Sequence, residues 1–381
     1  MACHGYRIAN ENLGPRLARR ASIGSRRRCD LSATFRRESL VLMVLAALIT
    51  GGGCATDYKP SVKVSEKAER WLKYSPNPAW SSIAANAVAQ YSSSGYTYKQ
   101  NLQDYSTSGD YLRYSITDVW LDIPGKIHLD ANGVPMVNHG GTYYYNPVTV
   151  AEFTLSEHGK YLAKLEPDLT KFWAGVKQLQ VLQGSDGALR YQSPFPYYLT
   201  GTTFQPGWTS GMAQGMALSV YARAYVLTHD ARYLNAGNAV LSFTLTEVRN
   251  GGTTNDLRYL QGSLTDDIFY DEYPATPSGY TLNGFMFAML GMYDWSQMPN
   301  TGTVAKDSFD EAMHTLTDIL PYYDIGGYSA YDLGHLTYHR EPHIGVQYHA
   351  VHIYLLHALG SLTNDPILKH FENLWASYVP Q

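Results

Sequence analysis

Cysteine is nearly absent from this chain of 381 residues, because Cys3, Cys29 and Cys54 are its whole supply. If the lead that holds Cys3 and Cys29 is removed and Cys54 is acylated, as argued below, the mature chain has no free thiol, so disulfides, thiolate metal ligands and cysteine nucleophiles are excluded there. Long apolar runs are also scarce. The run Leu40–Ile49 has ten residues, whereas a membrane-spanning helix needs about 20.

Residues 1–54 predict an export leader. Met1–Glu38 carries nine arginines and three acidic residues, and after the apolar run three glycines stand directly before Cys54. This order of basic, apolar and small residues is typical of a secretory signal. Cys54 resembles a bacterial lipoprotein processing site, although Gly51 occupies a position that usually holds leucine. We predict a lipid on Cys54 that anchors an exported domain to the envelope membrane, on its periplasmic or outer-membrane face; cleavage without lipidation is the alternative.

Positive charge is in short supply after the leader. Removing its nine arginines and three acids from totals of 29 and 33 leaves 20 basic and 30 acidic residues, a net charge of about −10. This balance argues against nucleic acid as a partner. An anionic polysaccharide would also be repelled at long range, so such a substrate requires a locally basic cleft.

The texture of the chain changes along its length. Residues 55–95 predict a polar lead ending in a serine-rich linker, "YSSSGY". Residues 96–145 contain short runs rich in tyrosine and β-branched residues, separated by Gly, Asn and Asp. Such runs are typical of strands and hairpins, so they predict a β-rich domain.

Residues 146–381 show helical periodicity in four consecutive pairs. The predicted helices cover 146–162 and 168–183, 209–228 and 230–248, 280–297 and 307–323, and 348–363 and 365–379. Each second helix has aspartate at or near its first turn, which suits the free N–H groups there. A single αα-hairpin cannot bury its apolar face, so four predict a helical toroid or αα-barrel. The fold class is thus α+β, with a β-rich domain before the barrel.

Tyrosine is abundant, with 32 copies in the chain. It clusters with Trp, Glu and His in the connections that lead into the first helix of each pair, such as "GGTYYYNP", "FQPGWTSG" and "DIFYDEYPATPSGY". Aromatic faces beside hydroxyl groups suit a sugar-binding cleft. Simple packing explains many tyrosines, but the clustering at four entries favours a glycan cleft on one rim.

Histidine is concentrated in "HLTYHREPHIGVQYHAVH", His335–His352. His335, His339 and His343 have the i, i+4 spacing of a helical zinc site, but Pro342 interrupts that helix and no further ligand set accompanies them. The spacing of His349 and His352, three residues apart, indicates two histidines that pack on one face of a helix. We therefore predict no metal and no cofactor.

Several blocks resemble the C-terminal region of D-glucuronyl C5-epimerases, which convert glucuronate to iduronate within heparan-type chains. They include "EYPATPSGYTLNGFMFAMLGMYDW", "GWTSGMAQGMALSVYARAYVLTHDARYLNAG" and "YDLGHL", and they run in the same order from about Tyr143 to the C-terminus. The resemblance implies an isomerase of glycosaminoglycan-like polysaccharide. It also implies a β-rich domain packed on an αα-barrel, and a homodimer.

Epimerisation at C5 removes a hydrogen next to a carboxylate from one face of the ring and returns one to the other. Two proton-handling groups must therefore face each other, with donors or cations around the carboxylate. By matching blocks, the acidic residue and the tyrosines of the family fall on Glu272, Tyr273, Tyr331 and Tyr348. We predict Glu272 as the base and Tyr348, or next Tyr273, as the donor on the other face.

The chain departs from the family pattern at two positions. Gly334 stands where an arginine is expected near the substrate carboxylate, so Arg340, His335 or His339 must substitute for it. Asn146 stands where a tyrosine usually precedes the proline, with Tyr145 beside it. The predicted substrate-binding residues are Tyr145, Asn146, Trp208, Gln214, His335, Arg340 and His349.

Three other functions remain open. A polysaccharide lyase would abstract the same hydrogen and then expel the 4-linked sugar. A glycoside hydrolase would need a second carboxylate opposite Glu272, and Asp267, Asp271 and Asp332 are weak candidates. A non-catalytic glycan-binding lipoprotein could retain the fold, and Gly334 is the best argument for it.

Overall fold

The computed structural model describes residues 75–117, 126–262, 264–299, 301 and 303–380. The predicted leader 1–54, with the lipidation site Cys54, lies outside these residues, as does the part 55–74 of the predicted polar lead. No helix within the described ranges is long and apolar enough to cross a membrane.

The eight predicted helices all form, in the predicted pairs. They are α4 (Pro147–Leu162) with α5 (Thr170–Leu182), α6 (Gly211–Thr228) with α7 (Ala231–Thr244), α8 (Leu282–Ser296) with α9 (Val304–Tyr323), and α11 (Tyr348–Thr363) with α12 (Pro366–Ala376). The two helices of each pair pack against each other. The shorter α10 (Gly334–Thr337) lies between the last two pairs.

Side-chain caps fix where several of these helices begin. Asn146 accepts hydrogen bonds from the backbone N–H groups of Val148 and Thr149 at the start of α4. Asp230 and Asp365 cap α7 and α12 in the same way. The aspartates at the starts of these second helices therefore have the predicted capping role, because each satisfies N–H groups that the helix leaves free.

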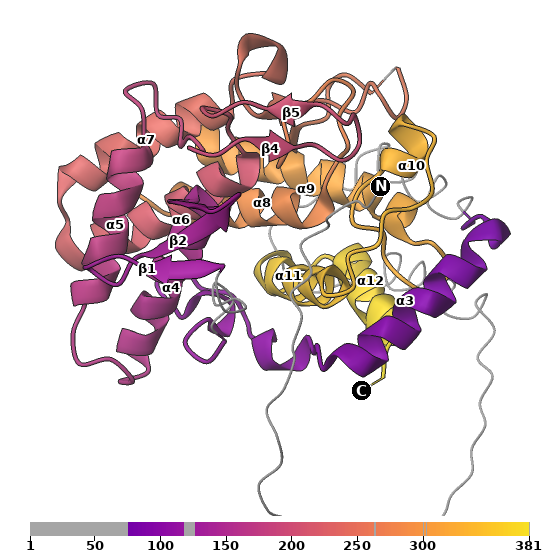
Figure 1. Ribbon diagram of the computed structural model, residues 1–381, viewed down its shortest axis with the longest axis horizontal. Helices are drawn as coiled ribbons and strands as arrows, with labels where there is room; N and C mark the ends of the chain where they lie inside the picture. The colour runs from indigo at the N-terminus through magenta and orange to yellow at the C-terminus, as the bar shows by residue number, and fades with distance from the viewer. Residues whose placement is uncertain (1–74, 118–125, 263, 300, 302, 381) are drawn as a thin grey trace, which may run out of the picture. The chain divides into compact units, whose positions relative to one another are not determined.

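The first helices of the pairs form a connected series in which α4 packs on α6, α6 on α8 and α8 on α11. The contact between α6 and α8 is close, because Gly215 and Gly291 meet there without side chains. The 3-10 turn η3 (Tyr111–Arg113) contacts both α4 and α11, the two ends of the series. The hairpins are confirmed, whereas a barrel closed by helix-to-helix contact is not seen in the described residues (Figure 1).

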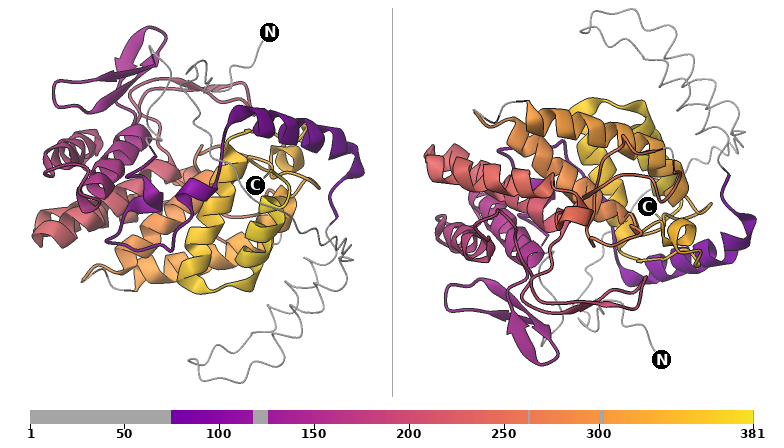
Figure 2. Two further views of the ribbon diagram at one scale, coloured as in Figure 1. Left: turned by 90° about the horizontal axis from the view of Figure 1, so that it is seen from below. Right: turned by 90° about the horizontal axis from the view of Figure 1, so that it is seen from above.

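The predicted β-rich domain at 96–145 is much reduced. Its strands are β1 (Ile127–Leu129), β2 (Pro135–His139) and β3 (Thr142–Tyr144), which form one antiparallel sheet. Gly140 and Gly141 make the β2–β3 turn with φ of 61° and 92°, angles that glycine adopts at little cost. Figure 2 shows this sheet at the edge of the helical array, where β2 contacts α4.

Residues 96–117 form turns in place of the predicted strands. Their segments include η2 (Lys99–Asn101) and η3, and the tyrosine side chains point inward: Tyr98, Tyr105, Tyr111 and Tyr114 are at most 7% exposed. The prediction of strands was wrong here because the aromatic residues pack edge-on against one another and against the helices, from a backbone that forms turns. A strand ladder would have required a paired backbone.

The predicted serine-rich linker is instead the end of helix α3 (Ser81–Ser94), which follows η1 (Pro78–Trp80). The hydroxyl groups of Ser92, Ser93 and Ser94 bond to carbonyls three or four residues earlier, so these serines are compatible with a helix. Tyr91 packs its ring edge-on against Tyr328 and His349. Helix α3 therefore lies beside the C-terminal helices, as Figure 1 shows.

Two short hairpins complete the described fold. Strands β4 (Phe195–Pro196) and β5 (Thr203–Phe204) pair with each other, as do β6 (Thr254–Asn255) and β7 (Phe269–Tyr270), and η4 (Val248–Asn250) precedes β6. Both hairpins lie in connections between helix pairs. They carry or support the side chains of the site described next.

Candidate active site

Glu272 lies two residues after the end of β7, and the intervening Asp271 fixes the backbone there. The Asp271 carbonyl accepts a hydrogen bond from the N–H of Gly211 at the start of α6, at 2.7 Å. Its carboxyl group accepts bonds from Ser278 Oγ at 2.5 Å and Asn255 Nδ2 at 3.1 Å. Asp271 is only 1% exposed, and its carboxyl group is occupied by these two bonds. It anchors the loop that carries Glu272.

The Glu272 carboxyl group is 8% exposed and lies against α8. Its Oε1 accepts a hydrogen bond from the Tyr331 hydroxyl at 3.3 Å. Its Oε2 has no hydrogen-bond partner among the described residues. Gly284 provides the space, because a Cβ atom there would lie 2.4 Å from Oε2. One carboxylate oxygen is thus oriented by a tyrosine hydroxyl, and the other is buried against α8 without a hydrogen-bond partner among the described residues.

Burial raises the pKa of Glu272 to about 7. The neighbouring Tyr273, Tyr331 and Asn283 side chains favour the ionised form and oppose the rise, whereas the charge of Asp332 adds to it. Desolvation exceeds the opposing hydrogen bonds, because a buried carboxylate loses most of its hydration. A carboxyl group with this pKa exchanges protons readily near neutral pH.

A second carboxyl group, Glu152 on α4, was missed in the sequence. Burial raises its pKa to about 8, and the charge of Glu272 contributes to that rise. The two carboxyl groups therefore interact electrostatically. The signal was a glutamate inside an apolar helix run, between Ala151 and Phe153, which are both buried.

The structure brings together all four residues predicted to be catalytic. The hydroxyl groups of Tyr273 and Tyr331 are 3.2 Å apart, and the rings of Tyr331 and Tyr348 have centroids 4.5 Å apart. Burial raises the pKa of Tyr273 and of Tyr331 well above the usual value for a phenol. Both phenols therefore keep their protons and can act as donors but not as bases.

Backbone contacts hold Tyr331 in place. Its N–H donates to the carbonyl of His343 at 2.8 Å, and its carbonyl accepts from the N–H of Leu282, the first residue of α8, at 3.1 Å. Tyr348 is the first residue of α11. Gly345 permits its position, since a Cβ there would lie 2.4 Å from Tyr348 Cδ2.

A buried carboxylate, Asp332, organises the next layer of the site. Its Oδ2 accepts hydrogen bonds from the Tyr198 hydroxyl at 2.6 Å and from His343 Nδ1 at 2.8 Å, and its Oδ1 accepts from the N–H of Gly334 at 2.7 Å. The sequence had suggested Asp332 only as a weak hydrolase partner and had not selected Tyr198 or His343. The sequence offered one signal: Asp332 and His343 lie near Tyr331 along the chain.

An aromatic platform of Tyr191, Phe195, Trp208 and Tyr273 lies on one side of this group. Trp208 stacks on Tyr191 with centroids 3.8 Å apart and an interplanar angle of 12°. Phe195 in β4 stacks on Tyr273 at 5.0 Å and 6°. Trp208 is half-buried, so part of its ring remains accessible. Aromatic residues from two of the connections therefore gather beside Glu272, whereas the glycan cleft itself stays a prediction.

Three residues predicted to bind substrate make other contacts. The Tyr145 hydroxyl donates to Asp130 in the β1–β2 turn at 2.8 Å. Asn146 is the cap of α4. Gln214 is fully buried, and its amide bonds to the N–H of Leu189 and the carbonyl of Gly187. The geometry therefore assigns structural contacts to these side chains.

The remaining predicted residues differ in accessibility. His349 is fully buried, with Nδ1 bonded to Ser329 and Nε2 to the carbonyl of Trp375, so its position does not support substrate binding. His335 is 6% exposed and packs edge-on against Trp80 at 4.9 Å. Arg340 is exposed and donates to the carbonyl of Tyr198 at 3.2 Å. Since the Tyr198 hydroxyl bonds to Asp332, Arg340 lies on the solvent side of the group around Asp332.

Metal binding finds no support in the described part of the chain. It contains no group of three or more His, Cys, Asp or Glu side chains able to hold an ion. The site instead combines a carboxyl group with a near-neutral pKa, several protonated phenols and an aromatic face. Such a set can remove and return a proton on a stacked sugar ring.

Comparison with known proteins follows this geometry. A family model described as the D-glucuronyl C5-epimerase C-terminus matches residues 183–377. A D-glucuronyl C5-epimerase from Caenorhabditis elegans is 33% identical over 185 residues, which cover 45% of this chain and 29% of that protein. An uncharacterized protein from Methanocaldococcus jannaschii is 31% identical over 157 residues, 41% of this chain and 48% of its own. The chain thus spans less than half the length of either relative.

Proposed function

Because the chain belongs to the D-glucuronyl C5-epimerase family, which its match over residues 183–377 establishes, we propose that it inverts C5 of glucuronate residues within a polysaccharide. The product residues are L-iduronate. The observation that carries this proposal is the Glu272 carboxyl group, buried with a pKa of about 7 and hydrogen-bonded to a protonated tyrosine.

Glu272 is the base in this mechanism. Its carboxylate takes the C5 hydrogen, and the Tyr331 hydroxyl, which donates to Oε1, orients the group. A pKa near 7 leaves a large fraction of the carboxyl group ionised at neutral pH and makes it more basic than an ordinary glutamate, whose pKa is about 4.3. The exchange rate should therefore rise with pH until Glu272 is ionised.

A tyrosine returns the hydrogen from the opposite face. Tyr348 is our first candidate and Tyr273 the second, because each contacts Tyr331, which donates to Glu272. A buried phenol that keeps its proton is a suitable donor to a carbanion-like C5. Tyr331 contacts Glu272, Tyr273 and Tyr348, so it links the two halves of the site.

The substrate we propose is a glycosaminoglycan-like polymer that contains glucuronate. The aromatic platform, which includes Tyr273, supports this choice, since sugar rings stack on aromatic faces. The polymer continues beyond the reacting sugar, and the aromatic platform gives a surface for a neighbouring sugar. We further propose that the enzyme is exported and held at the cell envelope through a lipid on Cys54, and that it acts as a homodimer.

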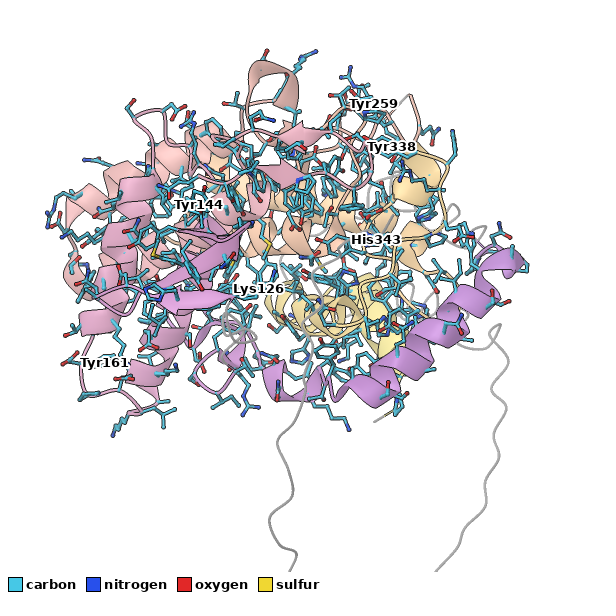
Figure 3. All side chains as sticks on the ribbon, in the orientation of Figure 1. Lys126, Tyr144, Tyr161, Tyr259, Tyr338 and His343 are labelled. Atoms are coloured by element: carbon cyan, nitrogen blue, oxygen red, sulfur yellow. The ribbon has the colours of Figure 1, made fainter. Side chains whose placement is uncertain are left out.

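Hydrogen exchange at C5 tests the activity. The exported domain is incubated in D2O with heparosan and with N-sulfated heparosan, and deuterium incorporation and iduronate signals are followed by NMR. Glu272→Gln and Tyr348→Phe should each reduce incorporation by roughly hundredfold or more, the size typical of lost acid–base catalysis. The matched controls are Glu311→Gln and Tyr161→Phe, which change exposed side chains; Figure 3 labels Tyr161 at the far end of α4.

The outcomes separate the candidate functions. Exchange that both active-site variants lose supports the epimerase. Growing ultraviolet absorbance from an unsaturated product would identify a lyase and contradict the proposal. Polymer binding without exchange, unaltered by Glu272→Gln, would identify a non-catalytic glycan-binding protein.

A further inference from the structure

His343 is held by a buried carboxylate and by two tyrosine rings. Its Nδ1 lies 2.8 Å from Asp332 Oδ2, and its ring packs on that of Tyr198 with centroids 4.5 Å apart. Asp332 is fully buried, whereas the His343 side chain is 38% exposed. A buried carboxylate therefore orients a partly accessible imidazole, whose Nδ1 carries the hydrogen that Asp332 accepts.

The same imidazole borders the proton-handling residues. Its ring meets Tyr331 edge-on, with centroids 5.0 Å apart. The His343 carbonyl also accepts the hydrogen bond of the Tyr331 N–H. Figure 3 labels His343 on the segment that joins α10 to α11, and α11 begins with Tyr348. With Nδ1 turned to Asp332, Nε2 lies on the opposite edge of the ring.

The proposed reaction requires a group for which no residue has yet been assigned. When C5 loses its hydrogen, negative charge spreads into the neighbouring carboxylate, and donors or cations must stabilise it. Position 334 cannot provide such a group, because even a Cβ there would lie 2.6 Å from Leu199 Cδ2 and 2.8 Å from Asp332 Oδ1. A long side chain at this position would displace the packing of Leu199.

The other expected substitutes are less suited by position. His335 is buried against Trp80, and burial lowers its pKa, so it remains neutral. His339 is exposed. Arg340 is exposed as well and bonds to the backbone of Tyr198. Among these groups His343 is the one that contacts a predicted catalytic side chain, Tyr331.

We propose that His343 binds the carboxylate of the uronate ring that undergoes reaction, and that Asp332 positions it for this role. The inference rests on the proposed function, whose substrate supplies that carboxylate. An imidazole that donates hydrogen bonds from both ring nitrogens, here to Asp332 and to the substrate carboxylate, is the cationic form, and both bonds are charge-assisted. His343 then supplies positive charge locally in a chain that is acidic overall.

Binding of heparosan is compared with binding of carboxyl-reduced heparosan, in which each uronate is replaced by a neutral sugar. The wild-type domain should prefer heparosan, and His343→Asn should lose roughly ten- to hundredfold of affinity for heparosan only, as expected for a charge-assisted bond. The matched control is His229→Asn. His229 is exposed after the last residue of α6, roughly 27 Å from the end that contacts Asp271, and asparagine tolerates its φ of 55°.

Asp332→Asn tests the positioning role. We expect a smaller loss of preference for heparosan than in His343→Asn, and no additional loss when both changes are combined, because the two residues act as one unit. Circular dichroism and thermal unfolding verify that each variant is folded. Additive losses in the double variant would contradict the positioning role of Asp332.

This experiment does not depend on turnover. If His343→Asn retains the full preference for heparosan, the proposed carboxylate site is wrong, even when C5 exchange proceeds. If the wild-type domain shows no C5 exchange but its preference for heparosan disappears in His343→Asn, the epimerase proposal fails while the carboxylate site stands.

Discussion

Glu272 combines two properties that a soluble protein rarely places together, a carboxyl group that is nearly buried and one oxygen without a partner among the described residues. Retaining such a group costs stability, because an ionised carboxylate is poorly solvated there. This unfavourably buried carboxyl group lies beside three tyrosines, and a perturbed carboxyl group in such surroundings indicates a functional residue.

The cost should appear as a dependence of stability on pH. The pKa of Glu272 is about 7 in the folded protein and about 4.3 when unfolded. The folded state therefore binds this proton more tightly, and its contribution to stability is present below about pH 4 and is lost as the pH rises through 7. Glu272→Gln has no such proton to lose, so its free energy of unfolding should not fall in this way. Relative to wild type, it should therefore gain up to about 3 kcal/mol between pH 4 and pH 8.

Urea unfolding of Glu272→Gln and wild type at both pH values checks this prediction. Glu311→Gln is the control, since Glu311 is exposed. A difference in unfolding free energy between Glu272→Gln and wild type that is the same at both pH values would contradict the raised pKa.

Gly284 should be as necessary for activity as the residues that handle protons. In Gly284→Ala the new Cβ would lie 2.4 Å from Glu272 Oε2 and 2.5 Å from Glu272 Cβ, so the carboxyl group must move. A misplacement of about 1 Å can reduce the rate by roughly a hundredfold. We expect a loss of that size in C5 hydrogen exchange. A Gly284→Ala variant that is folded and fully active would show that Glu272 does not act from this position.

At the scale of elements, capping and periodicity explain why the helices were predictable. Asn146, Asp230 and Asp365 bond to N–H groups only two or three residues away, so the relevant interactions are local. The serines of α3 show the opposite case. Their composition suggests a linker, but their hydroxyl groups bond within the helix and Tyr91 packs against distant residues.

The crossing of α6 and α8 depends on glycine. A Cβ at Gly291 would lie 2.0 Å from the carbonyl oxygen of Gly215, so Gly291→Ala must separate the helices. We expect a loss of about 1–3 kcal/mol in the free energy of unfolding, the range for overpacking. Gly360→Ala should instead be neutral or gain up to about 1 kcal/mol, because its nearest neighbour would be 3.8 Å away and alanine favours a helix.

Urea unfolding of the two variants measures this difference. If Gly291→Ala proves as stable as Gly360→Ala, the close approach of α6 to α8 is incorrect.

At the scale of the whole molecule, a buried ion pair joins the segment before the helices to the helical core. Arg223 on α6 and Asp294 on α8 are 2.9 Å apart and fully buried. Arg223 also donates to the carbonyls of Ser106 and Gly109, and the Tyr105 hydroxyl donates to Asp294. This network connects residues separated by more than one hundred positions.

Arg223→Met should therefore destabilise the protein by about 3–5 kcal/mol, since it leaves Asp294 buried without its charged partner. The double variant Arg223→Met with Asp294→Leu should recover part of that loss, because no unpaired charge remains. Chemical denaturation of the single and double variants measures both effects. A loss below about 1 kcal/mol in the single variant would show that the pair does not hold this segment.

The sequence by itself determined the eight paired helices and several of their caps. It also selected Glu272, Tyr273, Tyr331 and Tyr348 as one group, which the structure brings together, while their catalytic role stays a prediction. The helices followed from interactions within one or two turns, and the four side chains from matching blocks. It misplaced the strands of 96–117, because whether a tyrosine packs alone or in a ladder depends on distant partners.

Only the tertiary structure decided which side chains share a site. Glu152, Tyr198 and His343 reach Glu272 or Tyr331 from three separate segments, and Gly284 makes room for the carboxyl group. It also placed Gln214 and His349 in the interior with their polar atoms bonded. Periodicity fixes the face of a helix, whereas proximity between segments follows from how those faces pack, and that information is spread over the whole chain.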